Sequence, residues 1–300
     1  MKKESFWKYI FSVDTTSSNR IIIYFLGIRI RHLKKSIKNS GLQYVKLDCP
    51  ITEIPPATGK LRQIQLDNLE GIEFFDKICA QHGLQYWLDF GNLLGAVRHK
   101  GFIPWDDDVD FGMMRQDYEK FIELFENGFP NNDKYYIKFN NNGKDKCFVK
   151  VVNKDLPHVA MDIFPYDYYF KKTTTEEKLS LTEFLRKFTH KKYYKLLYPF
   201  FINNPKGMRK RLFNLRDKKI LKGNTPDIKS QPSLFYGIDY SHNHKILFVD
   251  YETIFPIKKI YYEGKYFSCP NDEDSLLKAE YGDYMKLPND CYPRHSNTEN

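Results

Sequence analysis

Four aspartates within five positions are the residues of this sequence best suited to chemistry: Asp106, Asp107, Asp108 and Asp110. In an extended strand, residues two apart lie on the same face, so we expect Asp108 and Asp110 to point the same way, with Asp106 close behind at the start of the strand. Carboxylates gathered in this manner repel one another unless a cation lies between them, and hard divalent cations prefer oxygen ligands. The spacing therefore predicts a site for Mg²⁺ or Mn²⁺ that acts on phosphate compounds.

A further acid, Asp162, lies between Met161 and Ile163 in a segment that is predicted to be a strand. A lone acid among apolar neighbours is unfavourable unless it is paired or liganded, so we expect Asp162 to complete the cation site. An acid run is most often a solvated loop. That alternative is weaker here, because the acids alternate with apolar residues and directly follow the apolar pair Pro104-Trp105.

The segment before the acids, residues 91–105, contains three glycines and is predicted to be a loop. Glycines let a backbone approach a phosphate closely, and its N–H groups can then cradle the anion. Gly91 is therefore a candidate phosphate-binding position, although glycines also mark ordinary turns.

A basic triplet follows in the same segment: Arg98, His99 and Lys100. These side chains could donate charge-assisted hydrogen bonds to phosphate oxygens, or they could form an ordinary basic surface. Asp89 precedes the segment and is a candidate general base for a hydroxyl group. Its alternative role is to cap the loop.

The elements that must position these residues follow from hydrophobic periodicity and turn signals. Helices are expected over residues 64–79 (ended by Gly83), 117–126 and 272–281 (ended by Gly282), and strands over 84–90, 108–113, 147–152, 159–163, 246–249 and 260–267. Residues 175–222 are rich in lysine and helix-prone. The order predicts an α+β fold with a small mixed β-sheet, flanked by helices, that carries the chemistry.

The net charge of +9 is unevenly distributed. Residues 1–40 hold nine lysines and arginines against two acids, and residues 171–230 hold seventeen against five, so the rest of the chain is acidic. We expect a basic N-terminal segment and linker over residues 1–55, with prolines at its end, and a catalytic domain over 56–300 with a basic helical insertion at 171–230. The N-terminal segment is either a solvated strand or hairpin, or an interfacial segment on anionic lipid.

Several classes of protein are excluded by composition. Aromatic residues make up 16% of the chain, too many for a disordered protein, and no apolar run is long enough to span a membrane. No signal peptide is expected. The five cysteines are scattered and form no CxxC pair, which argues against a disulfide framework and suits a reducing compartment.

Three motifs resemble the LicD family, whose eukaryotic relatives include fukutin and fukutin-related protein. They are YWLDFGNLLGAVRHKGFIPWDDDVDFGMMRQDYEKF over residues 86–121, VAMDIFPYD over residues 159–167, and AEYGDYMKLP from Ala279 with Arg294-His295 beyond it. Together they cover about a third of the chain, in family order. Arg294 and His295 are expected either to close over the site or to belong to a frayed tail.

The resemblance implies a nucleotidyltransferase fold related to polymerase beta. In that superfamily a glycine turn precedes an Asp-x-Asp strand, and a third acid lies on a later strand. Here Gly91-Asn92 takes the turn, Asp108 and Asp110 take the pair, and Asp162 takes the third place. Asn92 replaces the serine that is usual in the superfamily.

The resemblance also implies a reaction class. Family members transfer a phospho-alcohol, such as phosphocholine from CDP-choline, to a sugar hydroxyl and release CMP. The expected partners are therefore a CDP-activated alcohol and a glycan of lipopolysaccharide, capsule or teichoic acid, with Mg²⁺ or Mn²⁺ as cofactor. A cytoplasmic location, with peripheral contact to an anionic membrane, is expected.

Two other interpretations stay open at this point, and a third is not favoured. One is a nucleotidyltransferase that moves the nucleotide itself onto a sugar, alcohol or protein. Another is a non-catalytic partner in glycan assembly, against which the intact acid set argues. Nucleic-acid binding is not expected, because no reading motif is found and the centre of the chain is acidic.

Overall fold

A computed structural model covers the whole chain and describes residues 11–15, 20–25, 28–34, 54–127, 133–140, 148–189, 205–237 and 248–286. The chain divides into two compact units, residues 1–46 and 47–300. Arg294 and His295 lie outside the described residues.

The first unit contains an antiparallel sheet of three strands, β1 (Phe11–Thr15), β2 (Arg20–Phe25) and β3 (Ile28–Lys34). Short alternating apolar and basic stretches fold here as strands. Contact of this segment with anionic lipid stays a prediction.

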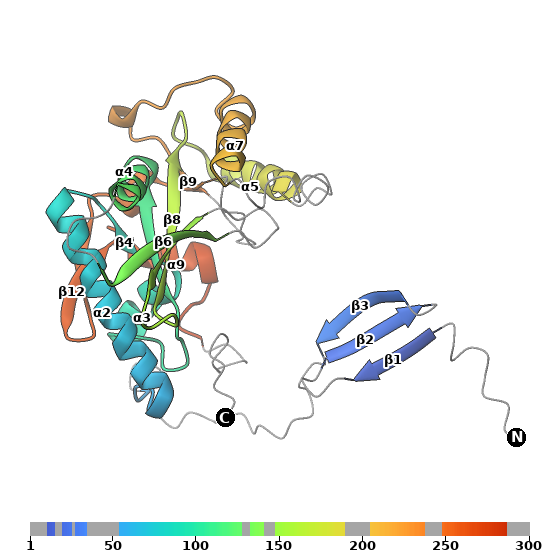
Figure 1. Cartoon of the computed structure of the whole chain (residues 1–300). Coiled ribbons are helices and arrows are strands. Elements are labelled where there is room, and N and C mark those ends of the chain that lie inside the picture. The colour runs from blue at the N-terminus through green and yellow to red at the C-terminus, as the bar shows by residue number, and fades with distance from the viewer. Residues whose placement is uncertain are drawn as a thin grey trace, which may run out of the picture. The chain divides into compact units, whose positions relative to one another are not determined.

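The second unit is built on a mixed sheet with the order β10-β9-β8-β5-β4, in which β7 also pairs with β8, and β6 with β7 (Figure 1). Its strands are β4 (Trp87–Leu88), β5 (Val109–Met114), β6 (Tyr135–Asn140), β7 (Phe148–Asn153), β8 (Ala160–Tyr168), β9 (Leu234–Tyr236) and β10 (Phe248–Val249). The pairing of β5 with β8 is parallel, and the other pairings are antiparallel. A separate hairpin consists of β11 (Lys258–Tyr262) and β12 (Lys265–Cys269).

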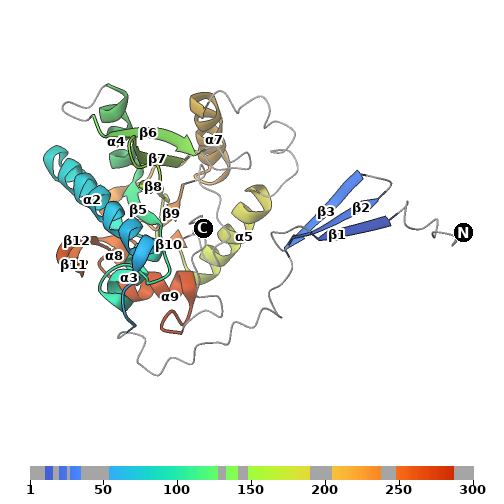
Figure 2. The same cartoon turned by 60° about the horizontal axis from the view of Figure 1, so that its bottom comes forward.

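Helices surround this sheet (Figure 2). They are α2 (Gly59–His82), α3 (Phe90–His99), α4 (Arg115–Glu126), α5 (Thr175–Thr189), α7 (Pro205–Lys219), α8 (Tyr251–Ile254) and α9 (Glu273–Tyr281), with a 3₁₀ turn at Ile228–Ser230. A mixed sheet flanked by helices confirms the predicted fold class.

The two faces of the central strands are covered by different helices. On one face, Phe75 of α2 stacks on Phe111 of β5, with ring centroids 4.2 Å apart. On the other face, Phe90 of α3 meets Phe164 of β8 edge-on at 4.9 Å. Because side chains alternate along a strand, Asp110 lies on the α3 side of the sheet.

The expected loop over residues 91–105 is wrong in its first half, because Phe90–His99 is a helix. The Asp89 side chain caps it by accepting a hydrogen bond from the Phe90 amide, and Leu93 is fully buried. The glycines of this helix allow neighbouring atoms to pack closely against it, rather than giving the backbone conformational freedom. A Cβ at Gly95 would lie 2.4 Å from the Gly101 carbonyl oxygen, so only glycine fits there.

Other predictions agree with the structure. The periodic segment that ends at Gly83 is α2, and Gly83 adopts the left-handed conformation expected of a C-terminal stop. Two strands, β6 and β9, were missed. The single strand expected over 260–267 is wrong, because this segment contains the turn of the hairpin β11–β12. The described helices include none that is long and apolar enough to cross a membrane, and Cys79 and Cys269 are free and buried.

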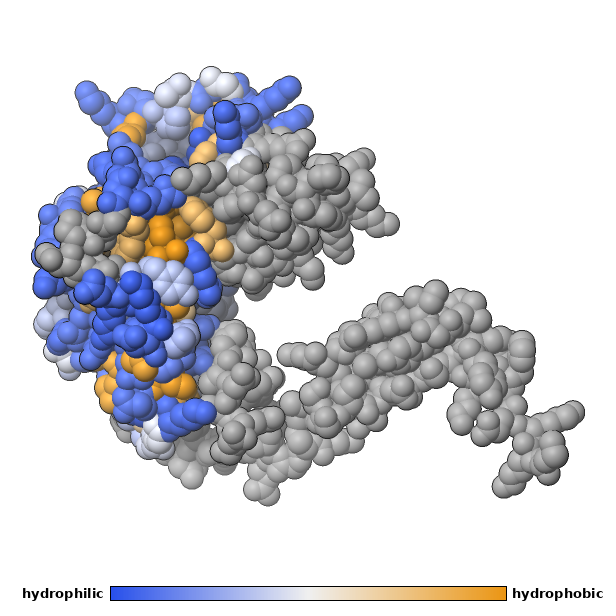
Figure 3. All heavy atoms as spheres, viewed as in Figure 1, coloured by the Kyte–Doolittle hydropathy of each residue, from blue (hydrophilic) through white to orange (hydrophobic). Residues whose placement is uncertain are grey.

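The described surface on the face shown in Figure 3 is mostly hydrophilic, with apolar side chains gathered in small patches between the polar ones. Hydrophobic residues instead form one core, in which Trp87, Tyr118 and Tyr166 are among the largest fully buried side chains. This core holds in place the strands that carry the charged residues of the candidate site.

Candidate functional site

Two aspartates lie side by side where the two parallel strands begin. Asp110 of β5 and Asp162 of β8 are register partners, and partner side chains on neighbouring strands point to the same face. Both residues are partly exposed, whereas Val109 and Phe111 on either side of Asp110 are buried. The structure therefore brings together the acids that the sequence placed 52 positions apart.

The run that precedes β5 adds three more carboxylates. Oxygen atoms of Asp106, Asp107 and Asp108 lie within 4.8 Å of one another. Asp107 was not among the expected ligands, and the structure adds it to this group. A Cβ at Gly91 would lie 2.6 Å from Oδ2 of Asp106, so the glycine allows this carboxylate to approach the N-terminus of α3, where the helix dipole favours negative charge.

The acids act on one another electrostatically. Burial, together with the negative charges of Asp162, Asp108 and Asp106, raises the pKa of Asp110 well above its ordinary range. Such a shift means that the ionised form is destabilised. A divalent cation would remove the repulsion, and carboxylate oxygens are the ligands that Mg²⁺ and Mn²⁺ prefer. This donor set fits a hard cation.

One positive charge also lies at this edge. Lys150 of β7 is the register partner of Asp162, and its Nζ lies 2.6 Å from Oδ1 of Asp162. Sequence reasoning missed Lys150, because a single lysine in an apolar strand carries no signal until the strand pairing is known.

Two buried amide side chains of α2 hold the acid run from behind. Nε2 of Gln65 donates to the carbonyl oxygens of Ile103 (3.1 Å) and Asp106 (2.9 Å), and Nδ2 of Asn68 donates to that of Asp107 (2.8 Å). Both side chains are almost completely buried. Since the carboxylates can keep one arrangement only if their backbone does, these amides position the site.

Asn92, which with Gly91 takes the turn position of the superfamily, makes two hydrogen bonds within the fold, and its contact with phosphate stays a prediction. Its Oδ1 accepts a hydrogen bond from the Asp110 amide at 2.6 Å, and its Nδ2 donates to the Tyr262 hydroxyl at 3.0 Å. Both contacts are buried or nearly so, and Asn92 is 2% exposed. The side chain therefore fixes the start of β5.

The hairpin β11–β12 holds the other end of the acid run. Glu263, at the hairpin turn, accepts two hydrogen bonds from Arg62 of α2, at 3.0 and 2.7 Å. It also accepts one from the Phe102 amide at 3.1 Å. Segments distant in sequence thus fix the turn that leads into the acids.

The basic triplet lies at the C-terminal end of α3. The Arg98 guanidinium lies over the ring of Trp105, 5.8 Å from its centroid, and donates to Nε2 of His99 and to the Tyr284 carbonyl oxygen. Burial, assisted by the charge of Arg98, lowers the pKa of His99 to about 4. Lys100 is exposed and ends the helix in the left-handed conformation. Phosphate binding by this triplet stays a prediction.

Asp89, the expected general base, has no exposed surface. It caps α3 and accepts a hydrogen bond from the Tyr166 hydroxyl at 2.8 Å, and its own amide donates to the Asp110 carbonyl oxygen. Burial raises the pKa of Asp89 to about 7, although these hydrogen bonds oppose the shift. The second alternative from the sequence, a capping acid, is the role that the structure shows.

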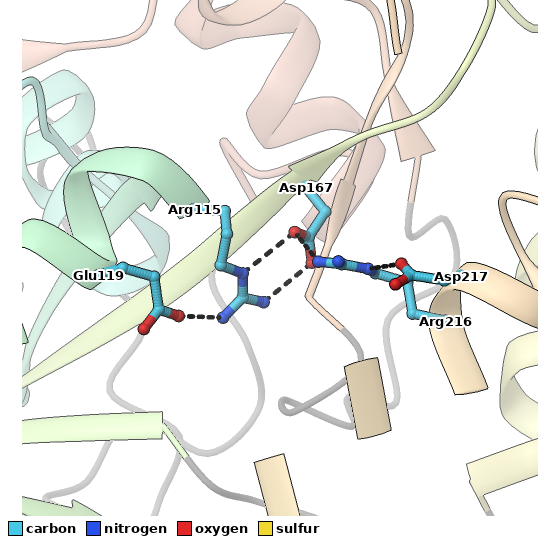
Figure 4. A network of polar contacts seen from close by, with 5 residues as sticks. All are labelled: Arg115, Glu119, Asp167, Arg216 and Asp217. Carbon is cyan, nitrogen blue, oxygen red and sulfur yellow. Dashed lines mark hydrogen bonds and ion pairs between the residues drawn. The ribbon is translucent and has the colours of Figure 1, made fainter. Parts of the chain in front are cut away.

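A separate charged network closes the opposite end of β5 and β8 (Figure 4). Arg115 donates to both oxygens of Asp167, at 3.0 and 2.8 Å, and Arg216 of α7 donates to the same carboxylate at 2.8 Å. Burial alone would raise the pKa of Asp167, but the two guanidinium groups outweigh it and lower the pKa. No local pattern in the sequence indicates this network, because Arg115, Asp167 and Arg216 are 49 to 101 positions apart.

Part of the chain is similar in sequence to known proteins. The family model described as LicD/FKTN/FKRP, nucleotidyltransferase domain, matches residues 83–202. The lipopolysaccharide cholinephosphotransferase LicD of Haemophilus influenzae is 45% identical over 65 residues, which are 22% of this chain and 24% of that protein. Human ribitol 5-phosphate transferase FKRP is 33% identical over 86 residues, 28% of this chain and 17% of that protein.

An uncharacterized protein of Rickettsia typhi is 32% identical over 101 residues, 32% of each chain. These matches thus span no more than a third of the relatives' own lengths. The matched segment 83–202 contains the five aspartates of the acid group, Asp106, Asp107, Asp108, Asp110 and Asp162, as well as Lys150. Residues 83–202 of this chain are therefore similar to the nucleotidyltransferase domain of the LicD family and of fukutin-related protein.

Proposed function

We propose that this protein transfers a phospho-alcohol from a CDP-activated donor to a hydroxyl of a cell-surface glycan, with phosphocholine as the first group to test. The observation that carries the proposal is the pairing of Asp110 with Asp162 beside the Asp106–Asp108 run. Two similar proteins are, by name, a lipopolysaccharide cholinephosphotransferase and a ribitol 5-phosphate transferase. Both names describe transfer of a phosphorylated alcohol.

The cofactor in this proposal is Mg²⁺ or Mn²⁺, held by Asp106, Asp108, Asp110 and Asp162, with Asp107 as a further donor. When bound, the cation neutralises negative charge on the donor diphosphate. These residues fit such a cation because their carboxylate oxygens are partly exposed and repel one another.

In the reaction, the acceptor hydroxyl oxygen forms a bond to the phosphorus of the phospho-alcohol, and the bond from that phosphorus to the CMP oxygen breaks. CMP leaves with the electron pair of the broken bond. The hydroxyl proton passes to a carboxylate of the partly exposed acid group, since Asp89 has no surface from which to receive it. Asp89 instead holds the N-terminus of α3 beside that group.

The test is to incubate the purified protein with Mg²⁺ and a panel of CDP-alcohols, and to measure CMP release with and without glycan acceptors. We expect CMP release that requires Mg²⁺ and rises with the correct acceptor. Glycan modification without CMP release, or turnover that is unaffected by removal of divalent cations, would contradict the proposal.

The family description, a nucleotidyltransferase domain, favours one second candidate: transfer of the nucleotide itself. The same acids would serve that reaction. Incubation with CTP and other nucleoside triphosphates distinguishes the two, because nucleotide transfer releases pyrophosphate whereas phospho-alcohol transfer releases CMP. Contact of the basic segments with anionic lipid remains a separate expectation.

A further inference from the structure

A row of four charged residues crosses the sheet at the candidate site. Asp110 of β5 is the register partner of Asp162 of β8, Asp162 is that of Lys150 of β7, and Lys150 is that of Lys138 of β6. Register partners on neighbouring strands present their side chains to one face. Two acids are thus followed directly by two lysines along one line.

This row is open to solvent although most other residues of β5, β7 and β8 are buried. Lys150 is partly exposed, whereas all the other residues of β7 are buried. The side chains of Lys150 and Asp162 are 25% and 18% exposed, and Lys138 is exposed. A ligand can therefore reach the row from the same side as the acid group.

The charges in the row are unevenly balanced. Lys150 forms an ion pair with Asp162, but its partner on the other side is a second lysine, and like charges directly opposite one another on paired strands are unfavourable. An anion placed over Lys150 and Lys138 would remove this repulsion, as a cation placed over Asp110 and Asp162 would remove theirs. A cation bound to a diphosphate supplies both charges at adjacent positions.

We propose that Lys150 binds the diphosphate of the nucleotide donor, next to the cation held by Asp110 and Asp162, and that Lys138 extends this contact. The inference rests on the proposed function and names the residues that recognise the donor phosphates. Without cation, Lys150 neutralises Asp162. With a cation and the donor bound, Asp162 would be a ligand of that cation, and the Lys150 ammonium group would be available to bind a phosphate oxygen.

The experiment uses the full chain and compares Lys150→Met, Lys150→Arg and Lys138→Met with the unchanged protein. Calorimetry measures the affinity for Mn²⁺ alone and for CDP in the presence of Mg²⁺. A hydrogen bond to a charged group corresponds to about tenfold or more in affinity. We therefore expect Lys150→Met to weaken CDP binding about tenfold or more, and Lys138→Met to weaken it by less.

The affinity for Mn²⁺ separates this role from a structural one. Since Lys150→Met removes a positive charge beside the acids, Mn²⁺ binding should be unchanged or tighter, and Lys150→Arg should restore most of the CDP affinity. Lys172→Met is the matched control, because Lys172 also pairs with a carboxylate, Glu252, but follows the other end of β8. It should bind CDP as the unchanged protein does.

Two failures are distinguishable. If the unchanged protein binds Mn²⁺ and releases CMP from a CDP-alcohol, but Lys150→Met binds CDP normally, the role of Lys150 is overturned and the proposed function stands. If the unchanged protein binds neither Mn²⁺ nor CDP, the proposed function fails, and this inference fails with it.

Discussion

The two ends of the parallel strand pair β5–β8 carry charged groups of opposite character. At the C-terminal end, Asp167 is nearly buried and receives hydrogen bonds from two arginines (Figure 4). At the N-terminal end, Asp110, Asp162 and the Asp106–Asp108 run are partly exposed, and the pKa of Asp110 is raised by burial and its acidic neighbours. The carboxylate at the C-terminal end is neutralised by arginines of the same chain, whereas the carboxylates at the N-terminal end still repel one another.

This difference indicates what each end is for. A buried charge with complete partners fixes elements in place. Here Asp167 joins β8, α4 and α7, and the guanidinium groups of Arg115 and Arg216 also lie over the ring of Phe213, 4.8 and 5.0 Å from its centroid. A partly exposed excess of one charge is costly unless a ligand completes it. We therefore assign stability to the Asp167 network and ligand binding to the acid group.

The largest expected effect is on catalysis at the open end. Asp162→Asn should lower turnover of the CDP-alcohol about a thousandfold or more, because it removes a charged ligand from a cation that supplies several kcal/mol of transition-state stabilisation. CMP release measures the effect, and circular dichroism checks the fold. Asp155→Asn, an exposed acid in the turn between β7 and β8, is the control. Equal turnover in both variants would remove Asp162 from the site.

The next effect is on stability at the closed end. Asp167→Asn leaves two partly buried arginines without the buried carboxylate that they share, and loss of one partner of a buried ion pair costs about 3–5 kcal/mol. Urea denaturation measures the free energy of unfolding. Asp217→Asn, which removes the more exposed partner of Arg216, should cost less than about 1 kcal/mol. Similar losses in the two variants would contradict the assignment of Asp167 as a buried clamp.

A smaller effect concerns both the stability of the fold and the binding of the cation. Asn68→Leu removes the donor to the Asp107 carbonyl oxygen, which should cost about 1–3 kcal/mol of stability and also weaken Mn²⁺ binding, because the acid run loses its fixed position. Gln63→Leu alters an exposed residue of the same helix and is the control. If Asn68→Leu lowers stability but leaves Mn²⁺ affinity unchanged, the amide does not position the site.

The smallest effect is a pH dependence. The pKa of His99 is lowered from 6.5 to about 4 in the folded protein, so the unfolded chain takes up the proton first as the pH falls. His99 therefore contributes stability that is present above pH 6.5 and is lost as the pH falls towards 4. Thermal denaturation from pH 7 to 4.5 should show a smaller loss for His99→Gln than for the unchanged protein. An identical loss in both would show that His99 does not titrate in this way.

Much of this could be predicted from the sequence, for local reasons. Periodic apolar spacing and terminal glycines located α2 and α9, and the acid run located the start of β5. The helix α3 was missed because Gly91 and Gly95 are typical of loops. In the structure, these two positions require glycine because Asp106 and Gly101 approach them closely, and such tertiary contacts cannot be seen in the local sequence.

The roles of the remaining residues of the site depend on contacts between segments that are distant in sequence. Lys150 gains its role from its register with Asp162, and Gln65 from a contact 38 positions away. Neither differs locally from an ordinary lysine of a strand or glutamine of a helix. Arg62 and Glu263, which also fix the acid run, are 201 positions apart, and no local pattern joins them.

Calorimetric titration of Mn²⁺ into the unchanged protein, Asp110→Asn and Asp167→Asn tests the central claim most directly, at a temperature where all three are folded. We predict saturable binding by the unchanged protein and by Asp167→Asn, and none by Asp110→Asn at the same concentrations. Equal binding by Asp110→Asn, or no binding by the unchanged protein, would contradict the assignment of the open end of β5 and β8 as a cation site.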